Sequence, residues 1–383
     1  MRRFLQRALL GRSGRRGVVS TLSQLCLFLL LSAFAWGEWL AYDWRARSWR
    51  RLPGVADDGS RQVRLMVVGD AQLIGYRNEP SSYGFLARWD CDRYLRNSFK
   101  RAARHFRPHV VVFLGDIFDE GSVADNAEFQ ATMERFNAIY HEYIADAQVL
   151  YLPGDNDVGG EGLEPVKAEK VRRFSRSFTS TFRPSNDHRY HGISFFHGFA
   201  FDGTHERLND AQGAPPELTV LLSHARVLHS KYPGARKIAS SVHPNLVLSA
   251  DDHKGRWLKA EPDGLTWGDL HENSSELPLS WRLRSSNGSV VELQTPTTSY
   301  RMGFPEMGIG IVTLDRLLEG GFEVTFDILW QPRRFPQLFC YGYAAGLAIS
   351  ALLLNTLLPL FHNIASTIRA NVYSAATKKG KKS

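Results

Sequence analysis

The sequence has few cysteines and lacks several patterns that would assign a function directly. Of its three cysteines, Cys26 and Cys340 lie in or beside long apolar runs, so only Cys91 remains in the middle of the chain. A disulfide within the middle portion is therefore excluded, and so is a metal site built from paired cysteines. The sequence also contains no internal repeat and no nucleic-acid-binding motif. We therefore expect no nucleic-acid partner.

Charge is missing from two long stretches, 18–37 and 335–361, which are rich in aliphatic and aromatic residues. A bilayer span needs about 20 apolar residues, so we predict transmembrane helices at 18–40 and 335–362. Two alternatives stay open. The first stretch could be a cleaved signal peptide, because a basic region precedes it. The second could be a buried core helix.

Acidic residues are absent from both ends of the chain, which are basic. By the positive-inside rule, the tails 1–17 and 363–383 are expected in the cytosol and the middle portion outside it. The net charge of +8 is concentrated in these tails and flanks, which favours contact with a membrane surface. The final Lys379–Ser383 resembles a Lys-X-Lys-X-X retrieval signal of early secretory membrane proteins, although a plain basic tail would look the same. Two Asn-X-Ser acceptors, at Asn273 and Asn287, are compatible with a luminal domain and a glycoprotein.

Between the apolar stretches we predict a juxtamembrane linker at 41–62 and one domain at 63–332. Strand and helix patterns alternate first, and strands dominate after Gly192. This order favours two packed sheets with helices outside them. The expected helices are 90–105, 126–145 and 165–178. The expected strands are 64–68, 109–114, 148–152, 193–196, 218–223, 246–249, 290–293, 309–314 and 322–329.

Five of these strands end in side chains that bind metal ions. Three β-branched, apolar strands end in Gly-Asp, at Asp70, Asp116 and Asp155. Two more end in Ser-His and in Ala-Asp-Asp-His. Ligands bind at the carboxyl ends of strands in open α/β sheets, and crowded carboxylates require cations. We therefore predict that these side chains form one metal site: Asp70, Asp116, Asp155, His224, Asp251 and His253.

The order of these motifs, and the segment Leu114-Gly-Asp-Ile-Phe-Asp-Glu-Gly121, resemble the calcineurin-like metallophosphoesterase superfamily. Within it the chain resembles the metallophosphoesterase 1 family, membrane enzymes that remove a side-chain ethanolamine phosphate from GPI anchors. The resemblance implies a four-layer α/β/β/α metallophosphoesterase sandwich flanked by two transmembrane helices. It also implies two divalent metal ions, with Asp116 bridging them and catalytic.

Three positions depart from the family pattern, because Gln72, Asn156 and Asp251 each replace a histidine. By resemblance, Asn156 stands where the family has the imidazole that stabilises the transition state. Its loss could cost on the order of 10²- to 10³-fold in rate. One ion would be held by Asp70, Gln72 and His253, and the other by Asp155, His224 and Asp251, with Asp116 shared.

The altered ligand set changes the charge of the site. Four carboxylates would just neutralise two divalent ions, so the site would attract a phosphodiester and polarise water less strongly. The shift towards oxygen ligands favours Mn²⁺ or Mg²⁺ over Zn²⁺, and we expect Mn²⁺. Among neighbouring residues, Arg301 could meet a substrate phosphate or lie on the surface. We expect Asp157 to bind loop amides and Asp119 and Glu120 to support the ligands.

The sequence thus predicts a multi-pass membrane metallophosphoesterase of the endoplasmic reticulum, intermediate compartment or Golgi, with its catalytic domain in the lumen. Its expected substrate is the GPI-anchor glycolipid of GPI-anchored proteins, and its expected role is to support their ER-to-Golgi transport. The alternative is a catalytically degenerate relative that binds GPI cargo or a trafficking receptor without hydrolysis.

Overall fold

The computed structural model places the described residues in two compact units. A helical unit comprises the two ends of the chain, up to Ala41 and from Arg334, and a globular unit spans Tyr42–Arg333. The described residues are 12–50, 62–160, 164–179, 190, 192–200, 203–208, 216–261, 263–273, 275–285 and 288–379. Most of the expected amino-terminal tail, the middle of the expected linker, Ser274, Asn287 and the last four residues lie outside them.

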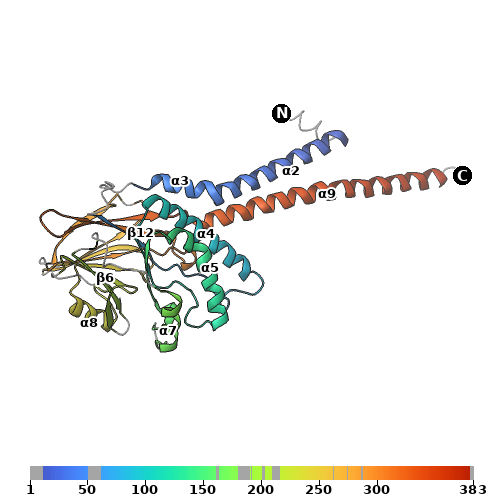
Figure 1. Cartoon of the computed structure of the whole chain (residues 1–383). Coiled ribbons are helices and arrows are strands. Elements are labelled where there is room, and N and C mark those ends of the chain that lie inside the picture. Colours follow the sequence, from blue (N-terminus) through green and yellow to red (C-terminus); the bar gives the residue numbers. More distant parts are fainter. Residues whose placement is uncertain are drawn as a thin grey trace. The chain divides into compact units, whose positions relative to one another are not determined.

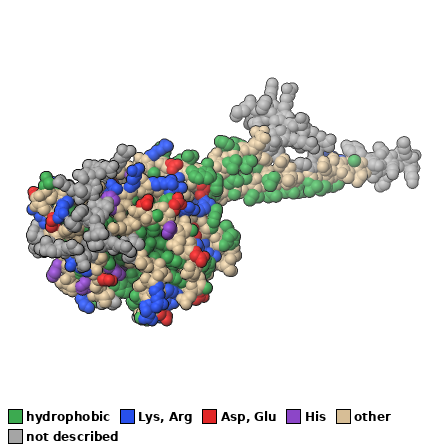
Figure 2. Space-filling model, in the orientation of Figure 1, with side chains coloured by type: hydrophobic (Ala, Val, Ile, Leu, Met, Phe, Trp, Pro, Cys, Tyr) green, Lys and Arg blue, Asp and Glu red, His purple; other side chains and the backbone are tan. Residues whose placement is uncertain are grey.

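The helical unit is built from two long helices that pack against each other (Figure 1). Helix α2 (Arg12–Ala35) runs into a π-helical turn, η1 (Trp36–Leu40), and α9 extends over Arg334–Lys379. Two stretches are long and apolar enough to cross a membrane. One is 23–48, which runs from α2 through η1 into the next helix, and the other is 334–357, within α9. Figure 2 shows many hydrophobic side chains on the visible surface of the described part of this unit. Helix α9 passes the expected span boundary at 362 without a break.

The first sheet of the globular unit has six strands in the order β10-β13-β12-β1-β2-β3. Strands β1, β2 and β3 are parallel, and β12 joins β1 antiparallel. The bounds are β1 Gln62–Val68, β2 Val110–Leu114, β3 Gln148–Leu152, β10 Leu279–Leu283, β12 Gly308–Arg316 and β13 Phe322–Trp330.

The second sheet has seven strands in the order β5-β4-β6-β7-β11-β8-β9. Strands β4, β6, β7 and β11 are parallel to one another. The bounds are β4 Ile193–Phe199, β5 Thr204–Arg207, β6 Leu218–Ser223, β7 Leu246–Ser249, β8 Gly255–Glu261, β9 Gly264–Leu270 and β11 Val290–Gln294.

The two sheets pack face to face, and helices cover their outer faces (Figure 1). Leu65, Val112 and Val220 belong to the apolar core between the sheets. The residues that alternate with these along the strands point to the outer faces of the sheets. Phe113, for example, packs against the rings of Phe99 and Phe136. Because the central strands are buried on both faces, their sequences are continuous apolar runs. The fold is therefore the predicted α/β/β/α sandwich.

The helices that cover the first sheet include α4 (Gly84–Phe106) and α5 (Asn126–Ile144), whereas the shorter α7 (Ala168–Ser177) buries only Phe174. On the second sheet, Ile238 and Val242 of α8 (Pro233–Val242) pack against the apolar side chains of β6 and β7. Helix α4 begins six residues before the expected helix. The prediction missed this start because the apolar side chains of the first turns face solvent and form no buried stripe. The expected linker also begins with a helix, α3 (Ala41–Ser48).

Candidate metal centre

Three parallel strands of the first sheet each deliver one carboxylate to the same edge. Asp70 follows β1, Asp116 follows β2, and Asp155 opens the short helix α6 (Asp155–Val158) after β3. All three side chains are almost completely buried. Parallel strands end on the same side of a sheet, so their carboxylates converge there.

The second sheet delivers the remaining candidates from two adjacent strands. His224 follows β6, and Asp251 and His253 follow β7. Since β6 and β7 are parallel, both loops open at the same end. The site therefore lies where the strand ends of the two sheets meet.

His224 stands at the centre of the cluster. Its Nε2 atom lies 3.2 Å from Asp155 Oδ1, 3.4 Å from Asp116 Oδ1 and 3.9 Å from Asp251 Oδ1. Two overlapping groups have ligand atoms within 4.8 Å of one another: Asp70 with Asp116 and His224, and Asp155 with His224 and Asp251. The second group is the set that we predicted for one ion. In the first group, His224 takes the place expected for His253.

His253 and Gln72 lie beside Asp70. His253 Nε2 is 3.5 Å from Asp70 Oδ1 and 3.4 Å from Gln72 Nε2. The structure therefore brings all seven predicted metal-binding side chains together, and their role as ligands stays a prediction.

The backbone of this cluster is in an uncommon conformation. Asp70, Gln72, Asp116, Asp251 and His253 all have positive φ values, between 39° and 67°. For residues other than glycine this left-handed region costs about 1–2 kcal/mol per residue. Such strain persists where the surrounding structure enforces it, and it concentrates at functional sites. Here it turns successive side chains of each loop towards one point.

Two glycines give the strand ends room to approach. Gly115 has a φ of 93°, and a Cβ there would stand 2.7 Å from Gly154 N and 2.8 Å from His224 Cγ. At Gly154 a Cβ would lie 2.1 Å from Asp116 Oδ1. A larger residue at either position would push Asp116 and His224 apart, so the Gly-Asp pattern is a packing requirement of the site.

Groups outside the cluster hold the ligands in orientation. His224 Nδ1 lies 2.7 Å from the Leu114 carbonyl oxygen, which can only accept, so Nδ1 carries a proton and Nε2 faces the carboxylates. This type of contact fixes the tautomer of metal-binding histidines. Asp157 accepts hydrogen bonds from the backbone amides of Ile117, Phe118 and Gly154. The expected role of Asp157 is therefore confirmed. The contact between His224 and the Leu114 carbonyl was not predicted, because no sequence pattern indicates it.

Two of the substituted positions act on the same carboxylate. Gln72 Nε2 and Asn156 Nδ2 both donate to Asp116 Oδ2, at 3.0 and 2.8 Å. The backbone amide of Asn156 donates to Asp116 Oδ1 at 3.0 Å. Asp116 is thus held by neutral amide donors at two positions where the sequence resemblance implied imidazoles.

The electrostatics of the cluster favour bound positive charge. Burial raises the pKa of the Asp116 carboxyl well above its usual range, and Asp155 and Asp70 raise it further, against the effect of His224. Burial together with the neighbouring carboxylates Asp70 and Asp155 also raises the pKa of Asp251 to about 6. Burial lowers the pKa of His224, but the carboxylates around it, Asp116 foremost, raise it well above its usual value. Protons therefore bind readily at this cluster, as cations would.

A family model described as calcineurin-like phosphoesterase matches residues 63–255, slightly more than half of the chain. The chain belongs to the calcineurin-like phosphoesterase family. Its residues 63–255 accordingly form a metallophosphoesterase domain. The matched segment runs from β1 through β7 and includes every residue of the cluster.

Similar proteins point to the same family. Cell division control protein 1 of Saccharomyces cerevisiae is 22% identical over 321 residues, covering 78% of this chain and 62% of the yeast protein. Metallophosphoesterase 1 of Ailuropoda melanoleuca is 28% identical over 140 residues, covering 37% and 33% of the two chains. These matches span less than two thirds of either relative. They confirm the resemblance to the metallophosphoesterase 1 family. The crystal structure of a metallophosphoesterase from Sphaerobacter thermophilus matches 76% of this chain and 98% of its own, with 13% identity and a TM-score of 0.30.

The family implies divalent metal ions, and the residues of this metallophosphoesterase fit them. Among the described side chains, no hydrogen bond reaches Oδ2 of Asp70 or Oε1 of Gln72, although both atoms are buried, and Asp70 Oδ1 has only His253 Nε2 at 3.5 Å. A buried oxygen without a partner is costly, and a cation would satisfy these atoms. The donor set of carboxylate, amide and imidazole groups suits Mn²⁺ or Mg²⁺.

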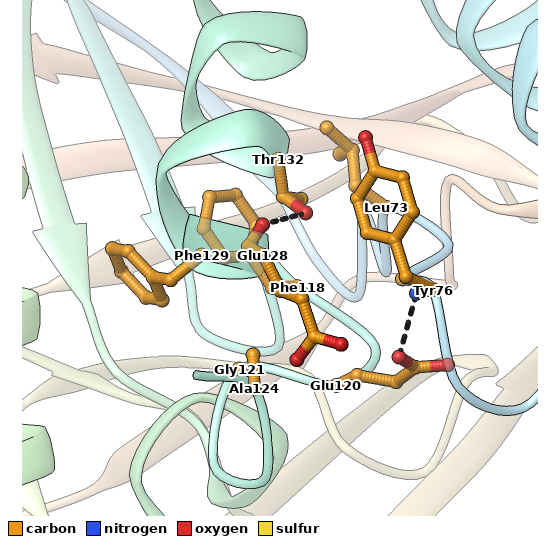
Figure 3. A pocket seen from close by; sticks show the side chains of 10 residues that line it. Leu73, Tyr76, Phe118, Glu120, Gly121, Ala124, Glu128, Phe129 and Thr132 are labelled. Atoms are coloured by element: carbon orange, nitrogen blue, oxygen red, sulfur yellow. Dashed lines mark hydrogen bonds between the residues drawn. The ribbon is translucent and has the colours of Figure 1, made fainter. Parts of the chain in front are cut away.

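Arg301 and Glu120, which were expected to meet substrate or to support the ligands, have partners outside the cluster. Arg301 forms an ion pair with Glu79. Glu120 accepts hydrogen bonds from the backbone amides of Tyr76, Arg77 and Asn78. Figure 3 shows Glu120 at the rim of a small pocket that Tyr76, Phe118 and Phe129 also line. The pocket contains none of the predicted ligands, and Glu120 already has its partners there, so its role is to shape the loop around Tyr76.

Proposed function

We propose that this metallophosphoesterase hydrolyses a phosphodiester on a membrane glycolipid and releases an ethanolamine phosphate side chain from GPI anchors. The observation that carries the proposal is an oxygen-rich cluster in a calcineurin-like domain whose chain continues on both sides into long apolar helices. A lipid-linked substrate stays at the membrane, so an enzyme anchored there meets it at high local concentration. By this activity the protein would support ER-to-Golgi transport of GPI-anchored proteins.

Two divalent ions, which we propose to be Mn²⁺, would be held by Asp70, Gln72 and His253 and by Asp155, His224 and Asp251, with Asp116 shared by both. When bound, such ions supply positive charge to the phosphoryl group and lower the pKa of water. The residues of the chain orient these groups. Asp116 is kept in place by Asn156 and Gln72, and the Asn156 amide is a donor beside the shared carboxylate.

We further propose that both apolar helices span the membrane of the endoplasmic reticulum, intermediate compartment or Golgi. Two basic, acid-free ends support a cytosolic placement of both termini. The globular unit would then lie in the lumen, on the side of the membrane where the glycans of GPI anchors are exposed.

A second function is favoured by one observation. Asn156 donates to Asp116 at 2.8 Å, whereas the family pattern has an imidazole that acts on the substrate. If this amide stays on Asp116, the site would bind metal and a phosphodiester without cleaving it. The protein would then act as a binder of GPI cargo or of a trafficking receptor.

One experiment on the full chain reconstituted in vesicles distinguishes the enzyme from the binder. GPI glycolipid carrying ethanolamine phosphate is supplied in the same bilayer, and released ethanolamine phosphate is measured with and without Mn²⁺. Release that requires Mn²⁺ and is lost in Asp116→Asn supports the enzyme. Bound Mn²⁺ without release, and without cleavage of bis(p-nitrophenyl) phosphate, contradicts it and supports the binder. Cleavage of the soluble diester alone contradicts only the GPI substrate.

A further inference from the structure

Large apolar side chains are exposed at the beginning of α4. The exposed fractions are 52% for Tyr83, 59% for Phe85, 51% for Leu86 and 54% for Trp89. We call these four residues the α4 patch. The opposite side of the same helix is buried against the sheet through Cys91, Tyr94 and Leu95, among others. The patch therefore contributes nothing to the core, and its exposure needs another explanation.

Guanidinium groups stand over aromatic rings in and beside the patch. Arg93 lies over the Trp89 ring at 4.1 Å, and Arg88 lies over the Tyr76 ring at 4.3 Å. Aromatic side chains mixed with arginines are typical of the zone where a bilayer meets water. There the rings reach the acyl chains and the cations meet lipid phosphates.

The two ends of the globular unit both contact α4. The chain enters the unit at Tyr42, whose ring packs on that of Tyr94 at 6.0 Å. It leaves the unit after Arg333, and the neighbouring Pro332 carbonyl accepts from the Tyr94 hydroxyl at 3.0 Å. Both connections therefore meet one residue of α4. Trp89 lies five residues before Tyr94, about 7.5 Å along the helix axis.

Hydrogen bonds also connect α4 with the loops of the metal centre. Asp92, about two turns into α4, binds Arg135 of α5 through two hydrogen bonds of 2.7 Å. Asp90 accepts from the Tyr300 hydroxyl at 2.8 Å, and three residues earlier Thr297 donates to the Asp70 carbonyl at 2.9 Å. One short loop thus connects the patch to a candidate ligand.

We propose that the α4 patch inserts into the interface of the bilayer that holds the apolar helices. Docking there would keep the metal centre at the level of the lipid head groups, where a glycolipid phosphodiester lies. The inference rests on the proposed function and topology, in which those helices span the membrane. A second copy of the chain fits less well. Four half-exposed side chains offer roughly 400 Å², about half of what each partner buries in a stable interface.

Photo-crosslinking of the full chain in phosphatidylcholine and phosphatidylserine vesicles tests the docking without using activity. A benzophenone amino acid replaces Trp89, or Trp267 as the control. Trp267 is a matched site, because it is 59% exposed and has Arg256 over its ring at 5.3 Å. We expect lipid adducts at position 89 to exceed those at 267 at least tenfold. Protein–protein adducts at 89, or equal lipid labelling at both positions, would overturn the proposal.

Two further measurements separate failure of the docking from failure of the function. Alkaline carbonate extraction first establishes that the chain is integral to the vesicles. If it is, missing lipid adducts refute only the docking. The triple variant Phe85→Ser, Leu86→Ser, Trp89→Ser is then compared with Trp267→Ser. We expect the triple variant to lose about tenfold in release from bilayer glycolipid and to keep its rate on bis(p-nitrophenyl) phosphate. Equal loss on both substrates would indicate damage to the fold and contradict the proposal.

Discussion

Both units of the molecule bury charged side chains, but they balance the charge differently. In the helical unit Glu38 and Arg334, each at least 95% buried, form an ion pair of 2.9 Å. In the globular unit four carboxylates gather around two histidines. Among the described residues, Asp70, Asp116 and Asp251 form ion pairs with these histidines and with no lysine or arginine.

In the helical unit, groups of the same chain satisfy the Glu38–Arg334 ion pair with further hydrogen bonds. Besides Glu38, the Arg334 guanidinium donates to Gln337 Oε1 at 2.9 Å and to the Gly37 carbonyl at 3.1 Å, and Tyr341 donates to Glu38 at 2.7 Å. Gly37 allows this approach, because a Cβ there would stand 2.0 Å from the Tyr341 hydroxyl oxygen. A buried charge pair is tolerated when its hydrogen bonds are satisfied in this way. This cluster joins two helices and offers no group to a ligand.

The metal centre shows the opposite arrangement. Its negative charges exceed the positive charge that the histidines can supply, and two of its buried oxygens, Asp70 Oδ2 and Gln72 Oε1, accept no hydrogen bond from the described side chains. Buried charges that are paired within the chain stabilise the fold. Buried carboxylates that exceed the positive charge of the chain around them instead require a bound cation. The difference in charge balance therefore distinguishes the Glu38–Arg334 pair, a clamp that joins two helices, from the metal centre, a binding site. This distinction does not depend on any similar protein.

Among the changes that test this comparison, removal of the shared carboxylate Asp116 should have the largest effect on activity. We expect Asp116→Asn to reduce Mn²⁺-dependent cleavage of bis(p-nitrophenyl) phosphate by about 10³-fold or more, because a ligand of both ions is lost. Bound manganese, measured by mass spectrometry of the metal, should fall as well. Asp146→Asn, at an exposed position after α5, serves as the control. Full activity in Asp116→Asn would mean that the site has been placed wrongly.

Breaking the ion pair of the helical unit should destabilise the protein without changing the metal centre. Glu38→Met leaves Arg334 buried without its partner, which costs about 3–5 kcal/mol. The free energy of unfolding can be followed by far-ultraviolet circular dichroism in mixed micelles titrated with dodecyl sulfate. The double variant Glu38→Met, Arg334→Met should recover most of the loss, since no charge is then left unpaired. A double variant as unstable as the single one would contradict the clamp.

The arrangement of the central strands was predictable because burial on both faces produces continuous apolar runs. Strands β2 and β3 were expected within one residue of their observed bounds. Helix α8 and strands β5, β8, β9 and β10 were not expected. Strands such as β8 and β9 are only half-buried, and they lack both a long apolar run and a strict alternation.

The convergence of the site followed from strand topology, since Asp116 and His224 both end buried parallel strands. The contacts between loops did not follow. Nothing in the sequence around Asn156 or Gln72 indicates that both amides meet Asp116, because the contact depends on left-handed backbone at Gln72 and Asp116. The Glu38–Arg334 pair was also missed, since each residue lies at the edge of an apolar run, where charges are ordinary.

A further buried acid, Glu292 in the globular unit, extends the comparison because the hydrogen bonds that it accepts come from neutral groups. It accepts hydrogen bonds from Ser249 Oγ and from the amides of Val227 and Leu228, and burial raises its pKa from 4.5 to about 7. Between pH 4.5 and 7 the folded protein keeps a proton that the unfolded chain has lost. The free energy of unfolding should therefore fall as pH rises through this window, by about 3 kcal/mol from this group, and stay level above it.

Thermal or chemical unfolding at several pH values checks this prediction as a difference between variants. Glu292→Gln should be less stable at every pH, because an amide cannot accept all three hydrogen bonds, but its stability should depend less on pH between 4.5 and 7. Glu134→Gln, exposed on α5, should keep the original dependence. An unchanged slope in Glu292→Gln would show that this carboxyl does not titrate in that range.

The smallest expected effect concerns the amide that replaces an imidazole beside Asp116. Asn156→His should increase the turnover rate by about tenfold, because an imidazole can donate a proton to the leaving group while the backbone amide of residue 156 continues to hold Asp116. Steady-state kinetics with bis(p-nitrophenyl) phosphate would place the gain in kcat and leave KM nearly unchanged. The paired variant Asp251→His, which removes one of the four carboxylates, should add to the gain. If neither substitution changes the rate, these positions do not correspond to the family histidines, and the excess of carboxylates must serve metal binding alone.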